Sequence, residues 1–379
     1  MINQSLYGRR NHNEDNSLEW KKGVKFAGRF RLLGLLGKGG FGEVWQARDL
    51  LLKQTVAIKI STSDLTKETL ILRQLPKDRY VSIFDYVIDK DAGSSAYSME
   101  LLEEPWITLD DYQGEYFSKQ FKNPMKAIGA AKMAIYVGID LLKTLCELHG
   151  KKYGKSNRWC HADIKPQNLY IHRKAAKMAQ ETPWGDHVLP FLKVGDLGLA
   201  RQSGSFLPAG TPRYMAPEQN GSGCVSPATD VFSVGQTLAA MITGDPFEEK
   251  DLKHVTRMKT VLARYIVSAH LVDKFSEALR RMMALTPAQR PTGEDTIRLL
   301  RGVMASEVDW KILSIFMRPE FAEGITLVDA ADILFDVFAP SRGWNKRSDD
   351  RIMELKSKVK SMCNRNILSR NGHKYSVRS

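Results

Sequence analysis

The hydrophobic pattern of this chain changes at Pro105, and the change limits the folds that the chain can adopt. Before Pro105, short apolar runs alternate with turns that contain glycine or serine, and one stretch after Asp64 has apolar residues at helical spacing. After Pro105, apolar residues recur with the period of an amphipathic helix, most clearly over residues 128–149. We therefore expect an α+β fold, with a small N-terminal β-sheet that carries one helix and a larger, mainly helical C-terminal part.

Composition limits the partners and the location of the protein. The chain of 379 residues is 43% hydrophobic, as in ordinary globular proteins, but its net charge of +13 is high. A basic surface attracts phosphates, nucleic acid or acidic partners, although a solvated surface is the simpler explanation. The four cysteines lack metal-binding spacing, which favours a reducing compartment. Since the polar N-terminus resembles no signal peptide and no apolar run is long enough for a membrane span, we expect a cytoplasmic location.

Residues 161–168 bring three kinds of polar side chain into one short loop. Asp163 supplies a carboxylate, Lys165 an ammonium group and Asn168 a carboxamide, and Pro166 stiffens the turn between them. A loop with these groups can orient a hydroxyl, neutralise a phosphate and hold a divalent cation. Phosphoryl transfer to an alcohol requires these three tasks.

Two further features suit phosphate binding. Gly37, Gly39 and Gly42 lie between two strand-like segments, where backbone amides can approach a phosphate closely, although a tight hairpin is the alternative. No helix follows the third glycine, which excludes a dinucleotide-binding turn. Lys59 ends an apolar strand; it could point to solvent, or it could bind phosphates while paired with Glu68 of the following helix.

Together, these segments resemble the protein kinase signature set. Five motifs occur in the order of that set, at residues 37–44, 56–59, 161–168, 196–198 and 216–218. The resemblance covers about residues 26–303 and implies a two-lobed, protein-kinase-like fold, with an N-lobe at 26–103 and a C-lobe at 104–303. Lys165 and Thr211 resemble the serine/threonine-directed branch, so ATP, Mg²⁺ and protein serine or threonine residues are the implied cofactors and substrates.

The resemblance also implies roles for single residues. Asp163 would be the base that orients the substrate hydroxyl, Lys165 would steady the γ-phosphate, and Thr211 would hydrogen-bond near both. Asn168 and Asp196 would hold Mg²⁺ through oxygen atoms. The residues expected around the nucleotide are Leu36, Gly37, Gly39, Gly42, Val44, Ala57, Lys59, Glu68, Met99, Glu100, Leu102 and Leu169.

Within the nucleotide set, the glycines and Lys59 would face the phosphates. Val44, Ala57 and Leu169 would enclose the adenine, Met99 would guard the back of the pocket, and residues 100–102 would form the hinge. Outside it, the resemblance implies structural roles only: Glu218 would pair with Arg290, Asp230 would anchor the catalytic loop, and His161 would pack beneath the site.

The sequence departs from the family pattern at Ala162, where many kinases have an arginine that binds a phosphorylated activation loop. Without that guanidinium, a phosphate on Ser203 or Ser205 lacks its usual partner, so we expect activity that does not depend on activation-loop phosphorylation. The connection from Lys59 to Glu68 is also short for the family, at nine positions.

An active, autophosphorylating serine/threonine kinase is the favoured interpretation, and two alternatives stay open. A small-molecule kinase of similar fold would usually lack the segment at 210–218 and Arg290. A pseudokinase that serves as a binding module would have lost Lys59, Asp163 or Asp196, and this chain has all three.

The two ends of the chain are expected to lie outside the catalytic domain. Residues 1–25 look disordered, and residues 304–341 are expected to form a helical extension that packs on the larger lobe. In the tail at 342–379, eleven Lys and Arg residues face three Asp and Glu residues. This basic tail could bind a polyanion or an acidic partner, but we expect it to be solvated or disordered.

Overall fold

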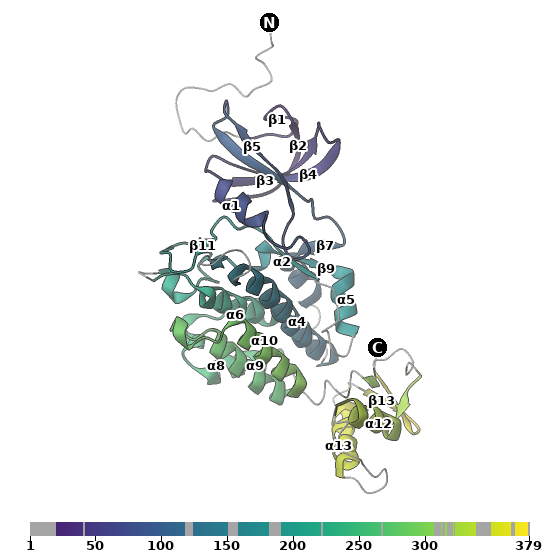
Figure 1. The fold of residues 1–379 in the computed structure, drawn as a ribbon. Helices are drawn as coiled ribbons and strands as arrows, with labels where there is room; N and C mark the ends of the chain where they lie inside the picture. The colour runs from purple at the N-terminus through teal and green to yellow at the C-terminus, as the bar shows by residue number, and fades with distance from the viewer. Residues whose placement is uncertain are drawn as a thin grey trace. The chain divides into compact units, whose positions relative to one another are not determined.

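The computed structural model describes residues 20–377, apart from residues 41, 118–123, 151–157, 182–190, 221–222, 267, 307–311, 313–314, 317–320, 322, 339–349 and 365–367. The chain divides into two compact units. The N-terminal unit comprises Met1–Glu104 and Val194–Ala200, and the C-terminal unit comprises Pro105–Lys193 and Arg201–Ser379. Figure 1 shows the sheet of the first and the helices of the second.

The N-terminal unit is built on a six-stranded antiparallel sheet with the order β1-β2-β3-β4-β6-β5. Its strands are β1 (Lys25–Phe26), β2 (Phe30–Gly39), β3 (Gly42–Asp49), β4 (Gln54–Ser61), β5 (Ile83–Asp89) and β6 (Ser94–Met99). Among the described residues of this unit there is one helix, α1 (Thr66–Leu72), which lies between β4 and β5 in the chain. The expected small sheet with one helix is thus confirmed (Figure 1).

Alternating side chains form the core of this sheet. Phe30 and Leu32 of β2 are fully buried, whereas Arg31 between them is exposed. β4 differs, because every residue from Val56 to Ser61 is buried, so both of its faces are covered. Lys59 therefore lies in a buried strand rather than at an exposed strand end.

The C-terminal unit contains four long helices that pack against one another: α4 (Pro124–His149), α6 (Pro227–Thr243), α9 (Ala269–Met282) and α10 (Gly293–Ser306). A β-carbon on Gly138 of α4 would lie 2.8 Å from the side chain of Leu238 of α6 and 3.1 Å from that of Leu300 of α10, so a larger residue there would make these leucines shift. Shorter helices of this unit are α2 (Leu109–Tyr112), α5 (Arg173–Glu181), α7 (Glu249–Leu252) and α8 (Val255–Leu262).

Short strands in this unit hold the segment that carries the predicted catalytic residues. β9 (Leu169–His172) lies between β7 (Trp106–Thr108) and β10 (Leu192–Val194), and β8 (Trp159–Cys160) pairs with β11 (Arg201–Gln202). Residues 161–168 connect β8 to β9, so both ends of this segment are held by strand pairing.

The C-terminal end of the chain is folded where the structure describes it. β12 (Ile325–Thr326), β14 (Lys374–Val377) and β13 (Leu368–Asn371) form an antiparallel sheet, accompanied by α12 (Leu327–Phe338) and α13 (Asp350–Asn364). Leu355, Val359 and Met362 are buried along α13. The expectation of a solvated or disordered tail is therefore wrong for α13 and the β13–β14 hairpin, because this apolar stripe packs. Residues 1–19 and 342–349 of the two predicted tails lie outside the described residues.

Two smaller points concern the expected boundaries and location. Helix α10 extends to Ser306, past residue 303, and the expected end of the kinase-like region at 303 stays a prediction. Whether the segment at 304–341 packs on the larger lobe stays a prediction. Among the helices that the structure describes, none is long and apolar enough to cross a membrane.

Candidate active site

Lys59, Glu68 and Asp196 form a charged group in the N-terminal unit, which we call the Lys59 triad. The Lys59 ammonium donates to both carboxylate oxygens of Glu68, at 2.9 and 3.0 Å, and to Oδ1 of Asp196 at 2.7 Å. Lys59 and Glu68 are each 5% exposed. Burial by itself lowers the pKa of Lys59, but the carboxylates of Asp196 and Glu68 outweigh it and hold that pKa above its ordinary value. Lys59 therefore keeps its positive charge, and the two carboxylates hold its ammonium group in place.

The short connection between Lys59 and Glu68 does not prevent their pairing. Local hydrogen bonds shape the connection: Oδ1 of Asp64 accepts from the Thr66 amide at 2.8 Å, and the Ser95 hydroxyl accepts from the Leu65 amide at 3.3 Å. Tyr97 of β6 donates to Oε1 of Glu68 at 2.8 Å. The structure thus brings the predicted pair together and adds a tyrosine that the sequence analysis did not identify.

The three glycines near β2 and β3 differ in what the fold requires of them. Gly42 has a φ of +126°, and a β-carbon there would lie 2.2 Å from the carbonyl oxygen of Ile60. No side chain fits at this position, so Gly42 has a packing reason besides any contact with phosphate. A β-carbon on Gly37 or Gly39 would meet nothing within 4 Å. Residue 41 lies outside the described residues.

The other residues expected around a nucleotide in this unit lie on adjacent strands. Val44 is opposite Lys59, and Ala57 is opposite Met99 in the sheet. Glu100 is held by Ser82, because its amide donates to the Ser82 carbonyl at 2.9 Å and its carboxylate accepts from the Ser82 amide at 2.7 Å. The carboxylate of Glu100 therefore shapes the backbone at the start of the expected hinge. Leu36 is exposed at 54%, and Leu102 is half-buried two residues beyond Glu100.

Asp163, Lys165, Asn168 and Thr211 form one hydrogen-bonded group in the C-terminal unit, which we call the Asp163 cluster. Oδ1 of Asp163 accepts from the amide of Thr211 at 2.9 Å and from its hydroxyl at 2.8 Å. The Lys165 ammonium lies 2.8 Å from Oδ2 of Asp163 and 2.8 Å from the Thr211 hydroxyl. The carboxamide of Asn168 donates to the carbonyl of Asp163 at 2.8 Å. All four residues predicted to be catalytic are thus brought together.

Asp230 of α6 holds the backbone that precedes Asp163. Its carboxylate is fully buried and accepts from the amides of His161 and Ala162, both at 2.8 Å, and lies 2.7 Å from Nε2 of His149. Burial alone would raise the pKa of Asp230, but its hydrogen bond with His149 and the bonded amides hold that pKa below its usual range. The expected anchoring role of Asp230 agrees with these contacts.

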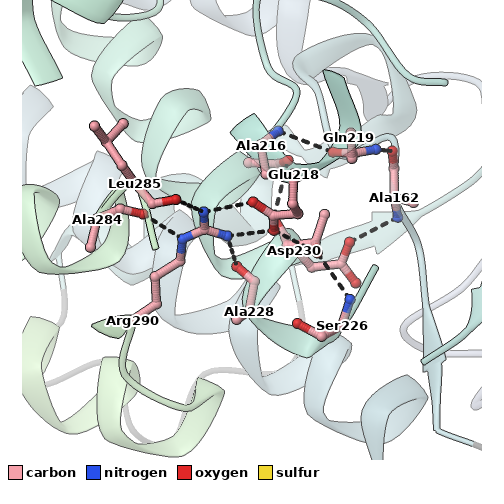
Figure 2. A network of polar contacts seen from close by, with 12 residues as sticks. Ala162, Ala216, Glu218, Gln219, Ser226, Ala228, Asp230, Ala284, Leu285 and Arg290 are labelled. Carbon is pink, nitrogen blue, oxygen red and sulfur yellow. Dashed lines mark hydrogen bonds and ion pairs between the residues drawn. The ribbon is translucent and has the colours of Figure 1, made fainter. Parts of the chain in front are cut away.

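The bond from Ala162 to Asp230 compensates an unusual backbone conformation. Ala162 has a φ of +64°, in the left-handed region that residues other than glycine rarely adopt. Its amide is bound to Asp230, and its carbonyl accepts from the side-chain amide of Gln219 at 2.9 Å (Figure 2). The side-chain oxygen of Gln219 also accepts a hydrogen bond from the amide of Ala216 at 3.0 Å, and its side-chain nitrogen donates to the carbonyl of Ala209 at 2.9 Å. This buried glutamine therefore joins the catalytic loop to residues 209–216.

Glu218 and Arg290 form a buried ion pair, as the sequence predicts. The guanidinium donates to both carboxylate oxygens, at 2.7 and 2.8 Å. Its other donors reach the carbonyls of Ala284, Leu285 and Ala228, so the pair is surrounded by hydrogen bonds (Figure 2). Burial works against ionisation, yet the hydrogen bond from Arg290 keeps the pKa of Glu218 below its ordinary value. Losing either partner would leave the other as a buried group without its counter-charge.

The sequence analysis missed Tyr97, Gln219 and His149. Each is a common residue outside the motifs or at their margin, and each acts through hydrogen bonds to residues far away in the sequence or in a neighbouring loop. Gln219 directly follows the motif at 216–218, which was the only available signal. A glutamine or tyrosine has many uses on a protein surface, so residue type alone could not identify these roles.

Comparisons with known proteins agree with this arrangement. The profile of the family described as protein kinase domain matches residues 30–299. The chain is 28% identical to the serine/threonine-protein kinase PLK4 of Drosophila simulans over 275 residues, which cover 69% of this chain and 31% of that protein. It is 26% identical to the serine/threonine-protein kinase chk-2 of Caenorhabditis elegans over 280 residues, which cover 68% of this chain and 53% of the relative. The serine/threonine-protein kinase Pkn1 of Myxococcus xanthus is 26% identical over 239 residues, or 59% of this chain and 30% of its own length. The chain thus spans about a third to a half of these relatives.

Proposed function

This chain belongs to the protein kinase family, and we propose that it transfers the γ-phosphate of ATP to serine and threonine hydroxyls of proteins. The Asp163 cluster carries this proposal, because a buried carboxylate faces both the ammonium of Lys165 and the hydroxyl of Thr211. Such a carboxylate can accept the proton of a substrate hydroxyl, while the adjacent cation balances the charge of a phosphate. The Lys59–Glu68 pair supports the same function, since a fixed lysine suits the phosphates of ATP.

In this reaction, Asp163 orients the substrate hydroxyl and takes its proton as the oxygen attacks the γ-phosphorus. The bond from that phosphorus to the bridging oxygen breaks, and ADP leaves. Thr211 keeps Oδ1 of Asp163 in position through its amide and hydroxyl. Lys165, at 2.8 Å from both Asp163 and Thr211, stays beside the transferred group and stabilises its negative charge.

Asn168 and Asp196 suit a magnesium ion, which would neutralise phosphate charge when bound. The amide nitrogen of Asn168 is engaged by the carbonyl of Asp163, so the amide oxygen is the atom suited to a cation. For the nucleotide we propose the set identified from the sequence: Leu36, Gly37, Gly39, Gly42, Val44, Ala57, Lys59, Glu68, Met99, Glu100, Leu102 and Leu169.

We further propose that activity does not depend on activation-loop phosphorylation. Ala162 carries no guanidinium, and its backbone groups already bind Asp230 and Gln219. The segment with Ser203 and Ser205 is held without a phosphate, because the Ser203 amide donates to the carbonyl of residue 158 at 2.7 Å and the Ser205 carbonyl accepts from the amide of residue 225 at 2.9 Å. The combined change Ser203→Ala and Ser205→Ala should therefore leave the kinase activity within about twofold of wild type. Loss of activity in a folded variant would contradict this proposal.

The decisive experiment is transfer of radiolabelled phosphate from ATP to generic protein substrates and to the chain itself. Wild type should label both, and Asp163→Asn should label neither above background. A protein that binds ATP but transfers nothing would be a pseudokinase. Transfer to a small molecule but to no protein would favour the small-molecule kinase alternative, although residues 210–218 and Arg290 are both present.

Three finer predictions belong with this function. We propose that the protein also phosphorylates itself, and, from the composition, that it is cytoplasmic. A polyanion or acidic partner at the basic tail would meet the exposed side chains of Lys356, Lys358 and Lys360 on α13.

A further inference from the structure

The turn between β3 and β4 exposes three consecutive leucines. Leu50, Leu51 and Leu52 are 36%, 68% and 56% exposed, and Lys53 closes the turn. Tight turns normally carry polar residues, glycine or proline. A run of three exposed apolar residues lowers solubility without contributing to the core, so it is expected only where it has a function.

This leucine turn has a fixed conformation. The buried carboxylate of Asp49 accepts from the amides of Leu51 and Leu52, at 2.9 and 3.1 Å, and the amide of Leu50 donates to the carbonyl of Arg29 at 3.0 Å. Arg29 in turn forms two hydrogen bonds with Asp49, at 3.0 and 2.8 Å. Since Asp49 and Arg29 hold the backbone, the leucines stay presented to solvent.

A row of three cations lies next to the leucine turn. Lys25, Arg31 and Arg48 are direct neighbours across strands β1, β2 and β3, and all three side chains are exposed. Within the described part of the chain, none of the three forms an ion pair. Like charges directly opposite one another destabilise a sheet, so this cation row works against folding. Arg48 is two residues from Leu50, which places the row and the turn at the same end of the sheet.

We propose that the leucine turn and the cation row together dock this protein onto an anionic membrane surface. Leu51 and Leu52 would enter the boundary between headgroups and acyl chains, and Lys25, Arg31, Arg48 and Lys53 would contact lipid phosphates. The combination favours lipid over nucleic acid, because leucines offer no stacking surface to bases. It also favours lipid over an apolar groove of a protein, where unpaired cations would lose their hydration.

The test is cosedimentation of the full chain with vesicles. One set contains phosphatidylcholine alone, and the other contains phosphatidylcholine and phosphatidylserine at about 7:3, which gives an anionic surface. Wild type should bind the anionic vesicles and leave the neutral ones in solution, and binding should weaken as salt rises. Equal binding to both vesicle types, or to neither, would overturn the proposal.

Matched variants separate this site from general charge and hydrophobicity. Leu51→Ser should weaken binding about tenfold, whereas Met353→Ser, with a similarly exposed side chain at 64%, should not. The double change Arg31→Gln and Arg48→Gln should weaken binding more than tenfold, at about fivefold for each cation. Arg280→Gln with Arg298→Gln removes the same charge elsewhere and should have little effect.

Equal losses from the test and control variants would overturn the proposal in favour of non-specific attraction. None of these residues belongs to the Lys59 triad or the Asp163 cluster, so kinase activity toward a soluble substrate should stay unchanged. A failure of membrane binding is therefore distinguishable from a failure of the kinase assignment.

Discussion

The Lys59 triad and the Asp163 cluster are centred on side chains of opposite charge, and their surroundings differ accordingly. In the N-terminal unit a buried cation is surrounded by carboxylate acceptors, and in the C-terminal unit a buried carboxylate is surrounded by donors. The carboxylates around Lys59 hold its pKa above the ordinary value despite burial, and the donors around Asp163 fix the position of its carboxylate. The difference matches the two tasks of phosphoryl transfer, since a fixed cation suits the phosphates of ATP and a fixed acceptor suits the proton of the substrate.

The two sites also differ in their support. Glu68 lies on α1, a seven-residue helix whose N-cap residue, Leu65, makes no side-chain capping hydrogen bond. The Asp163 cluster is tied through Asp230 to α6, a 17-residue helix with a capping box and a buried stretch from Thr229 to Ile242. A short helix without a cap opens locally more easily than a long buried one. We therefore expect changes in the Lys59 triad to act on nucleotide binding and local order, and changes in the Asp163 cluster to act on chemistry.

Exchanging the central residue of each site should produce the largest effects and separate the two roles. Lys59→Met and Asp163→Asn should each lower kcat/KM for ATP-dependent transfer by about a thousandfold. Lys59→Met should also weaken ATP binding, since Glu68 and Asp196 then lose their cation. Asp163→Asn keeps the size of the side chain and should leave ATP affinity unchanged. Calorimetric titration with ATP measures the difference, and the reverse pattern would contradict the assigned roles.

Breaking the Glu218–Arg290 pair should affect stability more than any other single contact near the Asp163 cluster. Arg290→Met leaves the Glu218 carboxylate buried without its partner, which should lower the free energy of unfolding by about 3–5 kcal/mol. Adding Glu218→Gln removes the unpaired charge and should recover part of the loss. Chemical denaturation of the two single variants and the double variant measures this coupling. Additive losses would show that the pair is not a coupled unit.

Removing the charge of Asp230 should have a smaller effect that depends on pH. Asp230→Asn weakens the hydrogen bonds to the amides of His161 and Ala162 and should cost about 2 kcal/mol at neutral pH. Because the folded protein holds the pKa of Asp230 below the ordinary 3.8, the stabilisation by this carboxylate is present above that pH and is lost as the pH falls through the folded value. The stability difference between wild type and variant should therefore be constant near neutrality and shrink in acid. A constant difference down to the acid limit would contradict this origin.

The sequence predicted most of the site because the residues that carry charge lie in motifs. The change in periodicity at Pro105 predicted a small sheet followed by a helical part, the resemblance of the motifs implied the two-lobed kinase fold, and both are confirmed. The roles of Gln219 and Tyr97 could not be predicted, because they depend on atoms that come close together only in the folded chain. The packing requirement at Gly42 could not be predicted for the same reason, since it depends on the backbone of Ile60 in the neighbouring strand.

The fold of the C-terminal tail was missed for a different reason. Leu355, Val359 and Met362 have helical spacing, but they are separated by many lysines, and a lysine-rich segment is typical of a solvated tail. Three apolar residues in a basic stretch give a weak signal, and it becomes decisive only when α12 and the β13–β14 hairpin cover them.

The smallest predicted effect concerns the strained backbone at Ala162, beside the Asp163 cluster. A left-handed conformation costs an alanine about 1–2 kcal/mol, and glycine avoids this cost. Ala162→Gly also loses a buried methyl group and makes the unfolded chain more flexible, so the net change in stability should stay below about 1 kcal/mol. Ala134→Gly is the matched control, because Ala134 is equally buried but helical, and it should destabilise the protein by about 1–2 kcal/mol. Because both variants lose the same methyl group, the difference between their losses in thermal stability reports the contribution of the backbone conformation. Equal losses would mean that the bonds from Ala162 to Asp230 and Gln219 hold a backbone that stores no strain.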